Sequence, residues 1–291
     1  MKISKTQQLK KDSPKSNMTI QFSVLMSVYS KETAEHLKEA MDSVFNQTLP
    51  PTEVVLVEDG PLTDPLYATI DALCAQHPEI RIVRIDTNQG LGLALRKGLE
   101  CCTYDLVARM DTDDISKPTR FEKQIRLFAE HPEVDICSAW IDEFVDVKEH
   151  VTHCRKLPET PDELYEFGKR RCPVNHPVCM YRKNAVLASG SYQYHPFLED
   201  YYLWVRMMVN GCRFYCIQEP LLWFRANPEM FKRRGGLGYA LEEFRLECLM
   251  HRIRYIGFGR LLKNVCIRFV TRLVPNGIRN LIYKQIRRQC V

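Results

Sequence analysis

The stretch Val107-Ala108-Arg109-Met110-Asp111-Thr112-Asp113-Asp114 joins an apolar run, typical of a buried strand, to three carboxylates within four residues. Carboxylates this close repel one another, so the end of such a strand needs a cation or a network of hydrogen-bond donors. Mg²⁺ and Mn²⁺ prefer carboxylate oxygens, and Mg²⁺ sites commonly add the phosphates of a substrate. Asp113 and Asp114 would also suit the start of a following helix, where acidic residues are favoured. Taken alone, the stretch leaves both interpretations open.

This acidic stretch follows the last of four apolar runs that alternate with helical patterns. Strands are predicted at residues 22–28, 54–57, 81–85 and 105–110. Between the strands, apolar residues recur at helical spacing around Leu37, Ile70 and Leu95. Such alternation predicts an α/β fold of the Rossmann-like kind, with a mainly parallel, doubly wound sheet flanked by helices.

Polar or acidic residues stand directly after each predicted strand. Tyr29 follows the first strand, Glu58 and Asp59 the second, residues 88–92 the third, and residues 111–114 the fourth. In a doubly wound sheet, ligands bind beyond the carboxyl ends of the strands. The four loops are therefore expected on one rim, and together they predict a nucleotide site.

The second half of the chain has less regular patterns. Phe121, Ile125 and Phe128 are spaced as one face of a helix, and strands are predicted at residues 134–140, 173–181 and 213–225. Residues 142–170 are polar and lack a clear period, which suits a variable segment on the acceptor side. Glu199 and Asp200 begin a helix whose buried side carries Leu203 and Trp204. Capping and dipole chemistry would also explain this acidic pair, with a contribution of roughly 0.3–1 kcal/mol.

Composition indicates an ordinary globular protein, with 45% hydrophobic and 26% charged residues in 291. Twelve cysteines are scattered without a CxxC pair, so their spacing predicts free thiols in a reducing cytoplasm rather than zinc ligands. No secretory signal is recognised in residues 1–17. The expected divisions are a flexible segment at 1–20, a catalytic domain at 21–247 with nucleotide (21–140) and acceptor (141–247) halves, and a tail at 248–291.

The tail differs in charge from the body that precedes it. Residues 248–291 contain ten Lys or Arg and no Asp or Glu, which leaves 31 basic and 36 acidic residues in the first 247. Two amphipathic stretches, at 261–273 and 278–288, place apolar residues opposite basic ones, with Asn264 and Arg268 expected on the polar face. This pattern fits a helix on an anionic membrane surface, although packing against the acidic body would also explain it. Nucleic acid is not expected as a partner, because no binding module accompanies the charge.

Five motifs together resemble one enzyme family. They are Ser23-Val-Leu-Met-Ser-Val-Tyr29, Val57-Glu-Asp-Gly60, Asn88-Gln-Gly-Leu-Gly-Leu-Ala94, Arg109-Met-Asp-Thr-Asp-Asp114 and Leu198-Glu-Asp200. Their order is similar to that of family 2 glycosyltransferases, in particular the amylovoran-type bacterial polysaccharide enzymes with a GT-A fold. The likeness covers roughly residues 22–225. Departures lie at Val28-Tyr29-Ser30 and at Arg96-Lys97.

The resemblance implies an inverting transfer of a sugar from a nucleotide-sugar, usually a UDP-sugar, to a lipid-linked or saccharide acceptor at the cytoplasmic face of the cell membrane. It makes Asp113, with Asp114, the ligands of Mn²⁺ or Mg²⁺, and Asp200 the general base. Nucleotide contacts are expected from Ser27, Val28, Tyr29, Glu32, Asp59, Asn88, Gly90, Arg96 and Asp111. Candidates for acceptor or diphosphate contacts are His176, Glu199, Trp204, Arg225 and Arg233. Arg109 receives no role.

The chemistry of the residues is consistent with this expectation. A cation at Asp113 would stabilise the charge of a diphosphate leaving group, and one carboxylate can deprotonate an acceptor hydroxyl. A non-catalytic sugar-nucleotide-binding subunit is the alternative, although such a module needs no base. A nucleotidyltransferase is disfavoured, because Tyr29-Ser30-Lys31-Glu32 lacks the glycines of a phosphate-binding loop.

Overall fold

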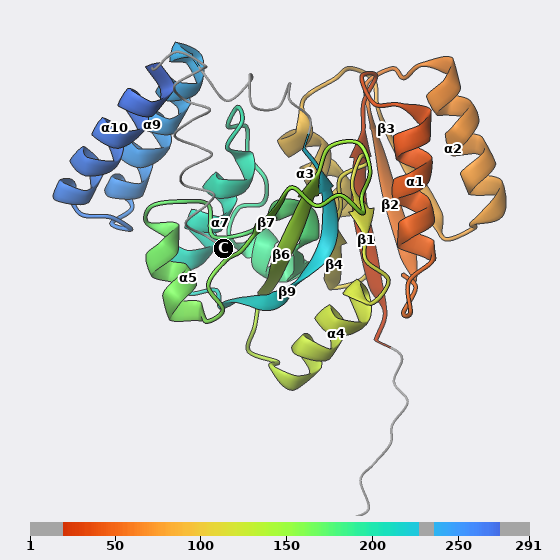
Figure 1. Ribbon diagram of the computed structural model, residues 1–291, viewed down its shortest axis with the longest axis horizontal. Helices are drawn as coiled ribbons and strands as arrows, with labels where there is room; N and C mark the ends of the chain where they lie inside the picture. Colours follow the sequence, from red (N-terminus) through yellow and green to blue (C-terminus); the bar gives the residue numbers. More distant parts are fainter. Residues whose placement is uncertain (1–19, 227–235, 274–291) are drawn as a thin grey trace, which may run out of the picture.

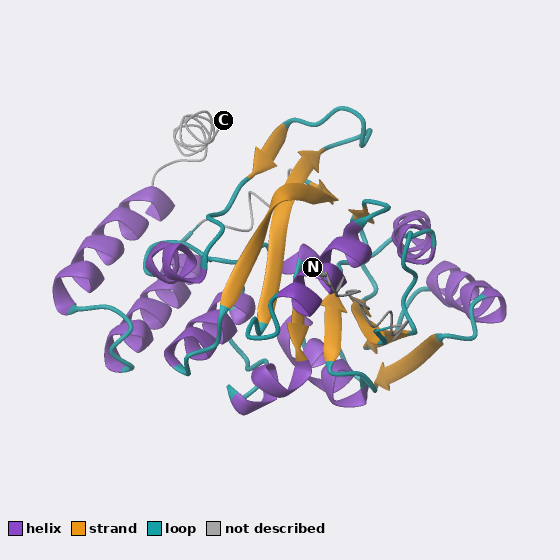
Figure 2. Ribbon diagram, turned by 90° about the horizontal axis from the view of Figure 1, so that it is seen from below, coloured by secondary structure: helices purple, strands orange, loops and turns teal. Residues whose placement is uncertain are grey.

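The computed structural model describes residues 20–226 and 236–273. A single twisted sheet lies at the centre, with helices on both of its faces and a pair of helices at one end (Figures 1 and 2). Residues 1–19 of the predicted flexible segment at 1–20 lie outside the described residues, as do the candidate Arg233 and the second amphipathic stretch at 278–288.

The N-terminal half forms the predicted parallel sheet. Its strands are β1 (Phe22–Val28), β2 (Glu53–Asp59), β3 (Ile80–Ile85) and β4 (Leu106–Arg109), in the order β3-β2-β1-β4. All three pairings are parallel, with Ser27 opposite Val57 and Leu25 opposite Arg109. The crossover helices are α1 (Ala34–Phe45), α2 (Asp64–Gln76) and α3 (Leu91–Cys101). The predicted alternation is confirmed.

The central strands are apolar on both faces, because each face is covered by helices. On one face Leu25 and Val57 pack with Leu95 and Leu99 of α3. Val24 and Met26 belong to the opposite core, which the side chains of α1 and α2 complete. Helix α3 lies close to the sheet: a Cβ at Gly98 would stand 2.5 Å from both Leu25 Cδ1 and Val57 Cγ2. Glycine at this position lets α3 and the strands β1 and β2 approach each other.

Beyond β4 the sheet becomes mixed. It continues through β8 (Met180–Arg182), β6 (Ile136–Phe144), β9 (Phe214–Arg225) and β5 (Ile115–Ser116), and β7 (His153–Arg155) pairs with β6. β8 runs antiparallel to β4 and β6, whereas β6 and β9 are parallel. The helices of this half are α4 (Arg120–Glu130), α5 (Pro161–Gly168), α6 (Lys183–Ala188) and α7 (Glu199–Val209).

One prediction for this half needs correction, and one stretch that the sequence left unassigned has regular structure. Residues 142–170 contain β7, and a capping box between Thr160 and Glu163 begins α5. The strand expected at 173–181 is limited to β8, because His176–Val178 forms a 3-10 helix. Pro177 lacks a backbone N–H for a strand ladder, and the Asn175 side chain instead donates to the carbonyl of Ala139 at 2.9 Å.

A helical hairpin of α9 (Leu237–Arg252) and α10 (Phe258–Leu273) stands at one end of the molecule (Figure 1). The predicted boundary at residue 247 falls inside α9. Asn264 and Arg268, expected on the solvent face, instead point to buried carboxylates of α9. Asn264 donates to Glu247 Oε2 at 2.9 Å, and Arg268 donates to Glu243 Oε1 at 2.9 Å. These carboxylates would be costly to bury without donors, so they draw the polar residues of α10 inward.

The outer face of α10 is apolar instead. Phe258 is 68% exposed and Leu262 57% exposed. Packing of the tail against the acidic body was the alternative to a membrane surface, and the inner face of α10 packs in this way against Glu243 and Glu247. Within residues 20–226 and 236–273, no helix combines the length and apolar composition that crossing a bilayer requires.

Candidate active site

The loops after β2 and β3 meet at the carboxyl edge of the sheet, as predicted. The Asp59 carboxylate accepts hydrogen bonds from Asn88 Nδ2 at 3.0 Å, Gln89 N at 2.8 Å and Gly90 N at 3.0 Å. Gly60 has a φ of +83°, and a Cβ there would stand 2.6 Å from Asn88 N. Asp59 thus shapes the loop that begins α3. Its predicted contact with the base and ribose stays a prediction, as do those of Asn88 and Gly90.

The acidic cluster consists of Asp111, Asp113 and Asp114. Each carboxylate offers an oxygen, and these oxygens all lie within 4.8 Å of one another. Burial, followed by the charges of Asp111 and Glu32, raises the pKa of Asp113 to about 7. Burial and the charges of Asp113 and Asp111 raise the pKa of Asp114 well above its ordinary value. Asp114 Oδ2 is buried and has no hydrogen-bond partner among the described residues.

The buried Asp114 Oδ2 has no donor within the described residues, and the raised pKa values of Asp113 and Asp114 indicate that their negative charges are poorly compensated. A hard divalent cation supplies what the carboxylates lack, since it takes carboxylate oxygens and removes their mutual repulsion. The donor set therefore fits Mn²⁺ or Mg²⁺. The alternative that Asp113 and Asp114 open the next helix is excluded, because the strand β5 follows them and α4 begins at Arg120.

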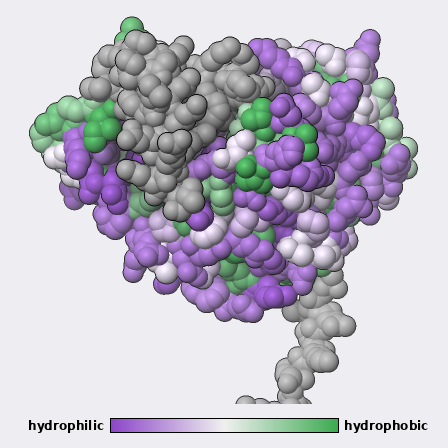
Figure 3. Space-filling view, in the orientation of Figure 1, coloured by the Kyte–Doolittle hydropathy of each residue, from purple (hydrophilic) through white to green (hydrophobic). Residues whose placement is uncertain are grey.

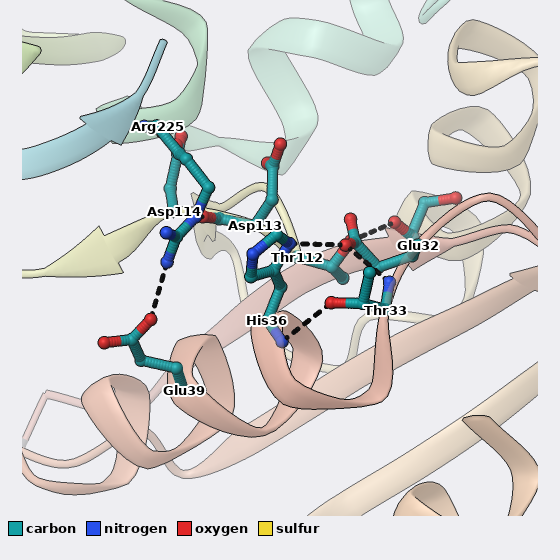
Figure 4. A network of polar contacts seen from close by, with 9 residues as sticks. Glu32, Thr33, His36, Glu39, Thr112, Asp113, Asp114 and Arg225 are labelled. Atoms are coloured by element: carbon teal, nitrogen blue, oxygen red, sulfur yellow. Dashed lines mark hydrogen bonds and ion pairs between the residues drawn. The ribbon is translucent and has the colours of Figure 1, made fainter. Parts of the chain in front are cut away.

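Arg225, at the end of β9, supports this cluster from the mixed half of the sheet. Its backbone N–H donates to Asp114 Oδ1 at 2.9 Å, and its Nε donates to the Asp113 carbonyl at 3.0 Å. Nη2 of the same side chain donates to Glu39 of α1 at 2.6 Å (Figure 4). Arg225 thus ties β9 and α1 to the acidic loop, a role that the sequence did not indicate.

Glu32 braces the other side of the loop. Its carboxylate accepts from the Thr112 hydroxyl at 3.2 Å and from the backbone N–H of Thr33 at 2.8 Å, and it lies 3.3 Å from His36 Nδ1 (Figure 4). The Thr112 hydroxyl also lies 3.4 Å from the Ser27 carbonyl. The start of α1 is thereby fastened to the loop, and a contact of Glu32 or Ser27 with the nucleotide stays a prediction.

Three further predicted nucleotide contacts lie in different surroundings. Val28 is fully buried in the sheet, and Tyr29 in the following loop is partly exposed. Arg96 is about half exposed and lies 3.6 Å from Glu100 of the same helix. A nucleotide contact of each stays a prediction.

Helix α7 brings two carboxylates to this edge. Asp200 Oδ1 accepts from the backbone N–H of Tyr201 at 2.6 Å, and the Cys172 thiol lies 3.7 Å from Oδ2. Glu199 lies against α3, since its Cβ stands 3.0 Å from the position of a Cβ on Gly92. Burial and the charge of Asp200 raise the pKa of Glu199 to about 7. Glu199 therefore borders the loop that begins α3, and Asp200 follows it in the first turn of α7. The role of Asp200 as the general base stays a prediction.

Trp204 lies on the buried side of α7, and His176 packs against it. Trp204 is fully buried, and its ring lies 5.7 Å from that of His176. His176 Nε2 lies 2.9 Å from the Tyr192 hydroxyl. Burial and the charge of Arg109 lower the pKa of His176 well below its ordinary value, so the imidazole is neutral. A contact of either side chain with the acceptor stays a prediction.

Arg109 is the functional candidate that the sequence left without a role. The side chain is 1% exposed and pairs with Asp111 Oδ1 through Nη2. Burial alone would lower its pKa, but the neighbouring Asp111 raises it, so the guanidinium stays charged. A cation inside an otherwise apolar strand is the signal that could have drawn attention to this residue.

The mixed α/β sheet, with an acidic cluster after its fourth parallel strand, has the architecture of a GT-A-like fold. A mannosyltransferase from Pyrobaculum calidifontis shares the fold, with a TM-score of 0.58 and 15% identity over 91% of this chain and 80% of its own. Residues 23–189 match the model described as "Glycosyl transferase family 2". The chain belongs to that family.

Two relatives are similar over nearly their whole length. The amylovoran biosynthesis glycosyltransferase AmsE of Erwinia amylovora is 39% identical over 92% of this chain and 99% of its own. UDP-Gal:alpha-D-GlcNAc-diphosphoundecaprenol beta-1,3-galactosyltransferase of Escherichia coli is 35% identical over 94% of this chain and 99% of its own. The chain is accordingly a glycosyltransferase.

Proposed function

We propose that this enzyme transfers a hexose from a UDP-sugar, with inversion, to a lipid-linked saccharide during assembly of a bacterial surface polysaccharide. The observation that carries the proposal is the meeting of the acidic cluster and the start of α7 at one edge of the sheet. The family, and the activities that the names of the two relatives state, support the choice of donor and acceptor.

Asp113 and Asp114 are the residues proposed to hold Mn²⁺ or Mg²⁺. Bound there, the cation would stabilise the negative charge that grows on the diphosphate as the glycosidic bond breaks. The mannosyltransferase from Pyrobaculum calidifontis was solved with GDP-Man and Mn²⁺, which supports a divalent ion in this fold. Arg225 and Glu32 keep the loop in place from its two sides.

Asp200 is proposed as the general base. It would accept the proton of the acceptor hydroxyl while that oxygen attacks the anomeric carbon from the face opposite the diphosphate. Direct attack needs one base and no carboxylate nucleophile, and the product therefore has inverted configuration. Glu199 is the competing candidate because it is adjacent in sequence and also borders the rim.

The decisive test of the function is a panel of nucleotide-sugars assayed with Mn²⁺. UDP-galactose, UDP-glucose, UDP-N-acetylglucosamine, GDP-mannose and TDP-glucose would be supplied with N-acetylglucosamine linked through diphosphate to a lipid. We expect nucleotide release from one UDP-sugar to depend on this acceptor, with an inverted anomeric centre in the product by NMR. Release from a GDP- or TDP-sugar alone would contradict the UDP assignment, and binding without transfer would favour the non-catalytic alternative.

We further propose that the hairpin α9–α10 rests on the inner face of the cell membrane. Phe258 and Leu262 are exposed one turn apart on α10, Lys263 beside them is exposed, and Figure 3 shows apolar side chains at the edge that α10 forms. Apolar side chains beside exposed cations suit an anionic lipid surface.

The membrane proposal is tested by the double variant Phe258→Glu, Leu262→Glu. We expect it to sediment less with vesicles that contain anionic lipid, because both apolar contacts are lost and two negative charges face the lipid. Lys38→Glu on α1 is the control for a simple change in net charge. Equal sedimentation of the double variant and the unchanged protein would refute a role for this face.

A further inference from the structure

Arg109 is a buried cation fastened to the rigid part of the sheet. Its backbone N–H donates to the Cys179 carbonyl at 2.9 Å, and its carbonyl accepts from Arg120 Nη2 at 2.6 Å. The neighbouring Met110 N–H donates to the Leu25 carbonyl at 3.1 Å. The backbone that carries the guanidinium is therefore held by β1, by the residue before β8 and by the first residue of α4.

The positive charge of Arg109 pairs with the acidic cluster. Nη2 donates to Asp111, whereas Nε and Nη1 are buried and have no hydrogen-bond partner in the part of the chain that the structure describes. A buried guanidinium needs compensating negative charge. Asp111 is the carboxylate that the guanidinium contacts. One carboxylate oxygen each of Asp113 and Asp114 lies within 4.8 Å of an Asp111 carboxylate oxygen.

Pairing with Arg109 changes what the cluster can offer to a cation. Three free carboxylates would form a strong cation site by themselves, whereas an Asp111 engaged by a guanidinium leaves two. Sites of one or two carboxylates generally take Mg²⁺ together with the phosphates of a substrate rather than alone. The fixed positive charge of Arg109 also repels a metal cation at the cluster.

We propose that Arg109 is a built-in counter-charge that withholds Asp111 from the cation, so that Mn²⁺ or Mg²⁺ binds firmly only together with the diphosphate of the donor. Arg109 is on this account a positioning residue, and it acts through Asp111 without touching the sugar. The inference rests on the proposed function for the presence of a diphosphate. It adds an order to the reaction: the cation enters with the nucleotide-sugar and is loosened when the nucleotide leaves.

The test compares Mn²⁺ binding by the full chain with and without UDP or GDP, followed by electron paramagnetic resonance of free Mn²⁺. The unchanged protein should bind Mn²⁺ weakly alone and more tightly with a nucleotide. Arg109→Met, of similar length and without charge, should bind Mn²⁺ alone at least about tenfold more tightly, because one positive charge beside the site is lost. Arg109→Lys keeps the charge and should resemble the unchanged protein.

Asp111→Asn keeps the inference testable if Arg109→Met does not fold. Because Asp111 is not a ligand on this account, Asp111→Asn should weaken the binding of Mn²⁺ alone by no more than the roughly tenfold that the loss of one nearby charge costs, whereas Asp113→Asn should abolish binding. Loss of Mn²⁺ binding in Asp111→Asn, or no tightening in Arg109→Met, would overturn the inference. Neither measurement requires sugar transfer, so failure of the proposed function would be seen separately as the absence of turnover with every donor.

Discussion

Asp113→Asn is expected to lower the turnover for sugar transfer by about 10²–10⁴-fold, because the diphosphate leaving group would lose the cation that stabilises its charge. The amide keeps the size of the side chain and one of its oxygens but loses the negative charge. Turnover would be measured at saturating donor and acceptor over a range of Mn²⁺ concentrations. A turnover within threefold of the unchanged protein would show that Asp113 does not hold the metal.

Thermal unfolding of the same variant separates lost chemistry from lost folding. Burial and neighbouring carboxylates raise the pKa of Asp113 from 3.8 to about 7. The folded protein therefore binds more protons than the unfolded chain in this interval, and the metal-free protein loses stability as the pH rises from about 4 to 7. Asn cannot ionise, so Asp113→Asn should match the unchanged protein in Tm most closely at or below about pH 4 and exceed it near pH 8. A lower Tm for the variant at pH 8 would contradict the direction of this pKa shift.

Asp200→Asn is expected to reduce turnover by about 10²–10⁴-fold, since an amide cannot accept the proton of the acceptor hydroxyl. The KM for the donor should change little, because Asp200 lies on α7 and not in the loops of the nucleotide rim. Glu199→Gln is the matched control: it removes the neighbouring charge and preserves the side-chain length. Both variants would be assayed for transfer and for donor binding under the same conditions.

The pair of α7 variants decides which carboxylate is the base. If Glu199→Gln loses transfer while Asp200→Asn keeps it, the base is Glu199. Burial and the charge of Asp200 raise the pKa of Glu199 to about 7, which would suit proton transfer near neutral pH. Donor binding lost in both variants would instead show that the start of α7 shapes the nucleotide site.

Local patterns in the sequence determined the parallel half of the fold. Continuous apolar runs predicted β1 to β4, and helical spacing around residues such as Leu37 and Leu95 predicted the crossover helices. Parallel connections in one sheet place successive carboxyl ends on one edge, so the meeting of Asp59 with Asn88 and Gly90 also followed from the chain order. The family followed from five motifs in that same order, and the matching family model confirms it.

The mixed half of the sheet depended on partners distant in the chain. β6 takes its neighbours from residues near 154, 181 and 215, and no local period predicts which run will pair with it. Residues 142–170 lack a clear period, and the helix α5 within them was missed although its capping box was visible in the sequence. Pairing register of this kind is set by packing across the sheet.

The roles of single charges were decided by the tertiary structure alone. Arg225 lies more than a hundred residues from the acidic loop that it braces, and Arg268 turns inward only because Glu243 is buried opposite it. Charged side chains are normally exposed, so sequence periodicity places them in solvent unless a buried partner is known. The acidic stretch from Asp111 to Asp114 predicted a cation site by its composition. Which of its carboxylates is free for the cation depends on Arg109, whose burial only the folded sheet reveals.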